Sequence, residues 1–86
     1  YKTSKHLDRI LIKLEKKNKK FYESLLKKMN EVLRNPEIEH YKNLKYKLKE
    51  YKRVHVGSFV LLFKYNKQED IIYFSDFDHH DKIYKK

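Results

Sequence analysis

The stretch KRVHVGSFVLLFKYNKQEDIIYFSDF, residues 52–77, decides the fold of this 86-residue chain. Polar and apolar residues alternate over residues 52–56, and residues 59–65 are almost continuously apolar, so each segment predicts a strand. Between them, the only glycine of the chain, Gly57, and Ser58 predict a tight hairpin turn. A polar loop leads to a third predicted strand over residues 71–77. This stretch therefore predicts an antiparallel sheet.

Two amphipathic helices are predicted upstream of the sheet. Ser4 is a candidate N-cap, and apolar residues follow it at the i, i+3, i+4, i+7 spacing of one buried stripe, which predicts a helix from about Lys5 to Lys16. After a short polar break, a second stripe runs from Phe21 to Leu33. This helix should end near Asn35, because Pro36 disfavours helical geometry in the residue before it. Two helices joined by so short a break form an antiparallel hairpin with one apolar side.

The order of these elements predicts the fold class. We expect an α+β fold in which an N-terminal helical hairpin packs on one face of a three- to four-stranded antiparallel sheet, followed by a short polar tail from Asp78 to Lys86. The other sheet face is left to solvent or to a ligand. No linker or internal repeat marks a boundary, so residues 1–86 are predicted to form a single domain.

Composition limits the environment in which the chain works. The longest apolar run, Phe59 to Phe63, has five residues, whereas a helix that spans a bilayer needs ~20, so no membrane partner is expected. The chain has no cysteine, which excludes disulfides and thiolate sites and suits a reducing compartment. We therefore expect a cytoplasmic location.

Positive charge is concentrated just before the first predicted hairpin. The chain has 22 Lys and Arg residues against 12 Asp and Glu, a formal net charge of +10, and residues 40–53 hold six of the basic residues and one Glu. Alternate lysines predict a further strand whose lysine row, spaced ~6.5 Å apart, matches the phosphate spacing of a nucleic acid. The candidate RNA-binding residues are Lys45, Lys47, Lys49 and Lys52. The alternative is that these lysines only keep the surface soluble.

One histidine of the first hairpin is a candidate catalytic residue. On a strand, the side chain of His55 leaves the face opposite to Val54 and Val56, on the same side as Arg53. An imidazole next to a permanent cation can act as acid or base beside a bound phosphate. The alternative is a surface histidine without a chemical role.

The end of the chain gathers carboxylates and imidazoles over residues 76–81. Such a set could in principle bind a divalent metal, but its spacing fits no recognised metal motif, so no metal site is predicted. Two interpretations remain, a tail with one catalytic histidine and a solvated terminus. The sequence leaves open whether His79 or His80 faces the site. We expect alanine at the inward histidine to reduce activity with little effect on stability, and alanine at the outward one to change neither.

Two segments carry a resemblance to a known family. They are NLKYKLKEYKRVHVGSFVLLFKY (residues 43–65) and FDHHDKIY (residues 77–84). Together with the order of elements, they resemble the RelE/ParE superfamily of toxins from type II toxin–antitoxin systems, and more closely its RelE-type branch, which cleaves messenger RNA. The match spans essentially the whole chain. Leu44 corresponds to a leucine that the family places in a basic stretch, and Tyr84 to its terminal tyrosine.

The resemblance implies a ribosome-dependent, metal-free endoribonuclease without a cofactor. It would cleave mRNA in the ribosomal A site by 2′-OH attack on the phosphate and so inhibit translation. The implied partners are an acidic, RelB-like cognate antitoxin, mRNA and ribosomal RNA, with operator DNA bound only through the antitoxin. The implied catalytic residues are Arg53, which holds the phosphate with help from Lys49 and Lys52, and the three proton-transfer and stacking residues His55, His80 and Tyr84.

Two positions depart from the RelE-type pattern. Val60 and His80 stand where such toxins usually have arginine, which predicts reduced activity or acid–base chemistry based on histidines. The alternatives are a non-catalytic relative, a ParE-like toxin that inhibits gyrase, and a generic basic RNA-binding domain.

Overall fold

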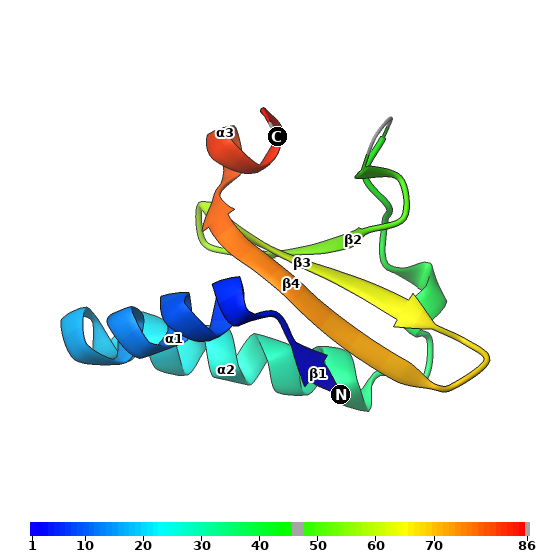
Figure 1. Ribbon diagram of the computed structural model, residues 1–86, viewed down its shortest axis with the longest axis horizontal. Helices are drawn as coiled ribbons and strands as arrows, with labels where there is room; N and C mark the ends of the chain where they lie inside the picture. The colour runs from blue at the N-terminus through cyan, green and yellow to red at the C-terminus, as the bar shows by residue number, and fades with distance from the viewer. Residues whose placement is uncertain (46–47, 86) are drawn as a thin grey trace.

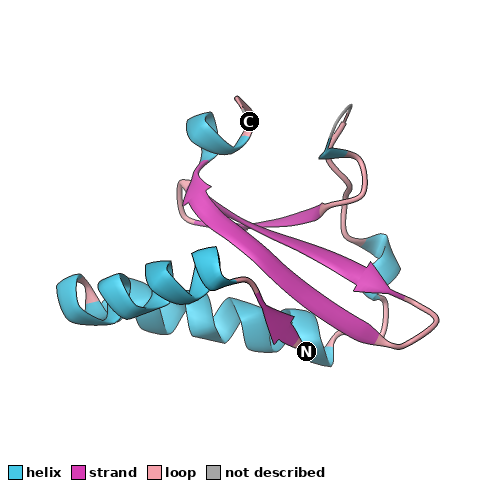
Figure 2. Ribbon diagram, in the orientation of Figure 1, coloured by secondary structure: helices cyan, strands magenta, loops and turns pink. Residues whose placement is uncertain are grey.

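The computed structural model describes residues 1–45 and 48–85. In chain order its elements are β1 (Lys2–Thr3), α1 (Lys5–Lys17), α2 (Lys19–Arg34), the 3-10 helix η1 (Ile38–His40), β2 (Lys52–Val56), β3 (Phe59–Asn66), β4 (Ile71–His79) and α3 (His80–Ile83). Figure 1 shows the α1–α2 hairpin on one side of the sheet and α3 on the other. Figure 2 shows the same arrangement by type of secondary structure. The predicted α+β fold, with a helical hairpin on one face of the sheet, is confirmed.

The two helices begin at side-chain caps. Ser4 Oγ accepts a hydrogen bond from the Leu7 amide (2.9 Å), which makes Ser4 the N-cap of α1 as predicted. Asn18 is the C-cap of α1, and its Oδ1 accepts from the Phe21 amide (3.1 Å) at the start of α2. One asparagine therefore ends the first helix and begins the second, and the hairpin closes on that residue.

The sheet is mixed, which corrects the expectation of a purely antiparallel sheet. Its strand order is β1-β4-β3-β2, with β2–β3 and β3–β4 antiparallel and β1 parallel to β4. A parallel pair requires a long connection, and here the helical hairpin and the central strands lie between its two members in the chain. Ser4 holds the junction between β1 and α1 against β4, because its amide donates to the Phe74 carbonyl (2.9 Å) and its Oγ to the Ser75 carbonyl (2.6 Å).

The main hydrophobic core lies between the helical hairpin and the sheet. The helices contribute Leu7, Leu25, Met29 and Val32, and the strands contribute Val56, Leu61, Phe63, Ile72, Phe74 and Phe77. A second, smaller core lies on the opposite face and consists of Leu44, Val60, Leu62 and Ile83. The second face is therefore partly covered by α3 and by the segment before β2, instead of being wholly open.

The strand predicted over residues 45–49 is wrong for the described residues. Asn43 forms an isolated bridge with Lys52, and the chain then leaves the sheet. The Leu44 amide donates to the Tyr51 carbonyl (2.9 Å), and the Leu44 side chain is buried in the second core. Leu48 is partly buried against the second core, and Tyr46 and Lys47 lie outside the described residues.

The C-terminal end is more ordered than the predicted polar tail. β4 continues to His79, and α3 follows at once. This short helix is held down by Ile83, which is fully buried. Among the residues that the structure describes, no helix is long and apolar enough to cross a membrane.

Candidate functional site

The sheet face opposite the helical hairpin carries the first two candidate side chains. Val54 and Val56 contribute to the main core, so the alternation of β2 directs Arg53 and His55 to the other face. In the antiparallel register, Arg53 lies opposite Leu62 and His55 opposite Val60 on β3. Both polar side chains therefore stand at the edge of the second core.

The helix α3 brings the other two candidates to the same place. The His80 amide donates to the Ser58 carbonyl (2.9 Å), which fixes the start of α3 at the β2–β3 turn. The imidazole of His80 lies with its ring centre 6.1 Å from that of His55, and the two planes are 26° apart. The ring of Tyr84 stands edge-on to His80, with 4.6 Å between ring centres and 67° between planes.

The guanidinium of Arg53 completes the group. It donates a hydrogen bond to the Tyr84 hydroxyl, and its central carbon lies 5.4 Å from the centre of the tyrosine ring. We call Arg53, His55, His80 and Tyr84 the histidine cluster. The structure thus brings together all four residues that the sequence predicted to be catalytic.

The histidine cluster has the chemical groups for work on a phosphodiester. The side chain of His80 is 50% exposed, and Tyr84 is 40% exposed as a whole residue, so a ligand can reach the cluster from solvent. An imidazole can donate or accept a proton, and a guanidinium stays charged and binds phosphate oxygens through paired N–H groups. The cluster can therefore hold an anion and move protons beside it.

Lys52 does not join the cluster. Its ammonium donates to the carbonyls of Glu39 and Tyr41 (3.1 Å each) and to Asn43 Oδ1 (2.9 Å). The ammonium thereby uses all three of its N–H groups, and these bonds hold the segment before β2 in place. The candidate RNA-binding residues Lys45 and Lys49 are exposed on the loop that precedes β2, and Lys47 lies outside the described residues.

The family resemblance suggests an arginine at position 60, where this chain has Val60. Its side chain is fully buried in the second core, where it packs with Leu62 and with Ile83 from α3. The position therefore helps to hold α3, and with it His80 and Tyr84, over the sheet.

His79 faces away from the cluster. Its Nδ1 accepts a hydrogen bond from the Asp81 amide (3.2 Å), which makes it the N-cap of α3, and its ring stands edge-on to Phe59 of the main core, with 5.6 Å between ring centres. His80 is therefore the inward histidine. The expectation that the outward histidine matters for neither activity nor stability is revised, since His79 stabilises the start of α3.

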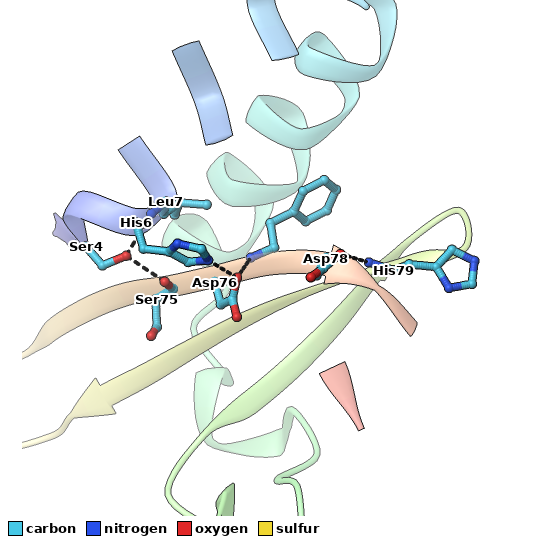
Figure 3. A network of polar contacts seen from close by, with 8 residues as sticks. Ser4, His6, Leu7, Ser75, Asp76, Asp78 and His79 are labelled. Atoms are coloured by element: carbon cyan, nitrogen blue, oxygen red, sulfur yellow. Dashed lines mark hydrogen bonds and ion pairs between the residues drawn. The ribbon is translucent and has the colours of Figure 1, made fainter. Parts of the chain in front are cut away.

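The acidic residues near the end of β4 have partners that the sequence did not indicate. The largely buried Asp76 accepts from His6 Nε2 (3.0 Å) and from the Phe77 amide (2.8 Å), and Asp78 accepts from the His79 amide (2.8 Å), as Figure 3 shows. His6 stands 70 residues before Asp76, so no local pattern could reveal this contact. Over residues 1–45 and 48–85, no three His, Cys, Asp or Glu side chains are grouped so that they could share a metal ion.

Comparison with known proteins places the chain in a family. The family model described as "ParE toxin of type II toxin-antitoxin system, parDE" matches residues 2–84. A Methanocaldococcus jannaschii protein named "Putative toxin RelE4" is 52% identical over 81 residues, which cover 93% of this chain and 84% of that protein. A Methanosarcina mazei protein named "Uncharacterized protein" is 45% identical over 84 residues, which cover 96% of this chain and 95% of that protein. No solved structure is significantly similar to the chain. Because the family model spans nearly the whole chain and a named toxin is about half identical to it, the protein belongs to the RelE/ParE superfamily and is a toxin of a type II toxin–antitoxin system.

Proposed function

We propose that this toxin is a ribosome-dependent endoribonuclease that cleaves messenger RNA by attack of a ribose 2′-OH on the adjacent phosphate. The observation that supports this most strongly is the histidine cluster. Arg53 and His55 come from β2, whereas His80 and Tyr84 come from the end of the chain, and folding brings them within ring-contact distance. Packing of the second core does not require this grouping of polar side chains, but phosphodiester cleavage does.

Each step of the reaction has a candidate group in the cluster. Arg53 binds the non-bridging oxygens of the phosphate and stabilises the charge that builds up on them. One neutral imidazole, of His55 or His80, removes the 2′-OH proton while O2′ attacks the phosphorus. The other imidazole, protonated, donates its proton to the leaving O5′ as the P–O5′ bond breaks. The products are a 2′,3′-cyclic phosphate and a 5′-hydroxyl, and the reaction needs no metal ion.

Tyr84 acts on the same substrate as an orienting residue. Its hydroxyl accepts from the Arg53 guanidinium, and its ring lies against His80. Tyr84 therefore orients both the guanidinium of Arg53 and the imidazole of His80. Because Tyr84 is 40% exposed, its ring also offers a surface on which a base of single-stranded RNA can stack.

The small number of cations explains why the ribosome is part of the proposal. The chain has three arginines, and Arg9 and Arg34 belong to α1 and α2, so Arg53 is the guanidinium of this site. With one guanidinium, transition-state stabilisation on naked RNA is weak, and correct placement of the message must come from outside. Binding in the ribosomal A site supplies that placement. Lys45, Lys47 and Lys49 are the proposed contacts to ribosomal RNA.

A second candidate function is inhibition of DNA gyrase without RNA cleavage. Two observations favour it: the family model that matches is described as a ParE toxin, and the buried Val60 replaces an arginine that RelE-type toxins usually have. In this case the histidine cluster would bind protein or DNA instead of reacting with RNA.

Two assays on the same preparation separate these functions. Primer extension on messages from translating ribosomes should show new breaks with the wild-type toxin and none with the His55→Ala variant. A supercoiling assay with purified gyrase should show no inhibition. Unbroken message together with inhibited supercoiling would reverse the assignment.

A further inference from the structure

A second group of exposed side chains crosses the sheet near the C-terminal end of β3. Lys64 on β3 pairs with Tyr73 on β4, and Tyr73 pairs with Lys2 on β1. Residues that pair directly across neighbouring strands direct their side chains to the same side of a sheet. The three side chains therefore form a row across β3, β4 and β1, which lie side by side in Figure 1. We call Lys2, Lys64 and Tyr73 the lysine–tyrosine row.

The alternation of β3 places this row on the face that carries the histidine cluster. Leu62 is buried in the second core and Phe63 in the main core, so Lys64 lies on the same side as Leu62. Leu62 in turn pairs with Arg53 of the cluster. A step of two residues along a strand is roughly 7 Å. A single RNA strand that is bound at Arg53 can therefore continue over the row.

The central residue of the row can stack on a base. Tyr73 is 37% exposed, whereas its neighbours Ile72 and Phe74 are buried in the main core. In the part of the chain that the structure describes, no other aromatic ring lies against Tyr73. Proteins that bind single-stranded nucleic acid use such aromatic rings as stacking surfaces for successive bases. Tyr73 is therefore suited to an unpaired base.

The two lysines of the row are available to phosphate groups. Lys2 is exposed and forms no ion pair with any residue that the structure describes. Lys64 Nζ lies 3.6 Å from Glu50 Oε2 and 4.6 Å from the centre of the Tyr51 ring. The Glu50 side chain is 73% exposed, so this ion pair is weak and a phosphate oxygen can replace the carboxylate.

The row borders a cavity of about 570 Å³, a volume within the usual range of ligand sites. Besides the row, its lining includes Lys67 and the side-chain amides of Asn66 and Gln68, together with Glu50 and Glu69. A side-chain amide both donates and accepts hydrogen bonds, as the edge of a base does. An aromatic ring, lysines and amides thus surround one cavity, and these groups together can bind a base and its phosphate.

We propose that the lysine–tyrosine row and its cavity are a second nucleotide-binding site, which holds a base of single-stranded RNA on Tyr73 and the neighbouring phosphates on Lys2 and Lys64. The proposal rests on the proposed function and deepens it, because it assigns the direction in which the message leaves the histidine cluster. The row adds to the placement of the message that the ribosome supplies. Its residues take no part in the chemical step, so binding and cleavage can be measured separately.

The first test measures stacking on Tyr73 without cleavage. The probe is a fluorescein-labelled single-stranded RNA with 2′-fluoro groups at every position, which lacks the 2′-OH nucleophile. In fluorescence polarisation, Tyr73→Ala should bind the probe at least about fivefold more weakly, whereas Tyr73→Phe, which keeps the ring, should stay within about twofold of wild type. Tyr1→Ala is the control, because Tyr1 is 72% exposed and packs against Phe74 of the main core. Circular dichroism checks that all variants are folded.

The second test counts phosphate contacts through their dependence on salt. Each phosphate that a lysine neutralises on a single strand contributes about 0.7 to the slope of log affinity against log salt concentration. The paired change Lys2→Gln and Lys64→Gln should therefore reduce this slope by roughly 1.4. The matched control, Lys16→Gln and Lys20→Gln, removes the same charge from exposed positions of the helical hairpin and should leave the slope unchanged.

Message cleavage on translating ribosomes separates failure of this proposal from failure of the proposed function. If the wild-type toxin cleaves the message but Tyr73→Ala keeps its full affinity for the probe, the second site is refuted and the ribonuclease stands. If the message stays intact while the Tyr73→Ala and lysine variants still bind the probe weakly, the row stands as an RNA site and the ribonuclease is refuted. A loss of affinity confined to a labelled DNA duplex would also overturn the proposal, because the row would then be a DNA surface.

Discussion

Alanine in place of His80 should abolish most message cleavage with little loss of stability, whereas alanine in place of its neighbour His79 should do the reverse. The His80 side chain is 50% exposed, lies against the rings of His55 and Tyr84, and has its Nδ1 3.4 Å from an exposed Asp81 carboxylate oxygen. Its removal should therefore lower the free energy of unfolding by less than about 1 kcal/mol. Loss of one acid–base group typically lowers the rate by roughly 10²- to 10⁴-fold.

His79 has a structural role that can be given a magnitude. Its Nδ1 caps α3, and loss of a side-chain cap lowers the free energy of unfolding by about 1 kcal/mol. Its edge contact with Phe59 adds about 0.5 kcal/mol. For a domain of this size, the sum of about 1.5 kcal/mol corresponds to a fall in Tm of roughly 6–12 °C. The folded fraction of this variant should still cleave.

The assay combines primer extension on translating ribosomes, well below both Tm values, with thermal unfolding followed by circular dichroism. His40→Ala serves as control, because that side chain is 76% exposed and lies on η1. Equal losses of cleavage in the two neighbouring variants would refute the placement of His80 in the cluster. A large loss of stability confined to His80→Ala would refute it as well, since the ring would then be a packing residue.

Three further changes test how the structure supports the site. Val60→Arg restores the family's arginine, but the position is fully buried, so the variant should lose several kcal/mol of unfolding free energy and gain no activity. Urea unfolding measures the loss of stability, and a stable, more active variant would contradict the prediction. Lys52→Ala should lower Tm, since three acceptors lose their donor, but should leave the affinity for a labelled RNA oligomer nearly unchanged in fluorescence polarisation. Gly57 has a positive φ of 59°, and nothing lies within 4 Å of an added Cβ, so Gly57→Ala should lower the free energy of unfolding by about 1 kcal/mol through backbone strain alone. An unchanged midpoint in urea unfolding would show that the turn relaxes.

Strong periodic patterns predicted most of the fold, and the errors fall where patterns are short. The helices and the strands β2, β3 and β4 follow regular apolar patterns, and their predicted ends differ from the observed ones by at most two residues. β1 has two residues and α3 has four, so neither is long enough to show a period. The N-cap of α3 is a histidine, which is not among the residue types that usually announce a helix start.

The strand prediction over residues 45–49 rested on lysines that alternate with Tyr46 and Leu48. Just before this stretch, Leu44 is buried in the second core and its amide donates to the Tyr51 carbonyl instead of to a neighbouring strand. The side of β2 on which Arg53 and His55 lie could be predicted, since alternation with two core valines is a local signal. The tail pattern suggested one catalytic histidine without choosing between His79 and His80, and the role of Tyr84 came only from the family resemblance, because contact across the sheet has no local signal. Lys52 illustrates the opposite case, a lysine whose charge looked available in sequence and is used within the fold.

The central claim is that a ribose 2′-OH of the message is the nucleophile and that the histidine cluster moves its proton. The most direct measurement programmes ribosomes with a message that carries a single 2′-deoxynucleotide at the position cleaved by the wild-type toxin. Cleavage should vanish at that position, while the all-ribose message should yield a 2′,3′-cyclic phosphate and a 5′-hydroxyl. Cleavage that persists at the deoxynucleotide, or fragments that end in a 3′-hydroxyl and a 5′-phosphate, would contradict the account.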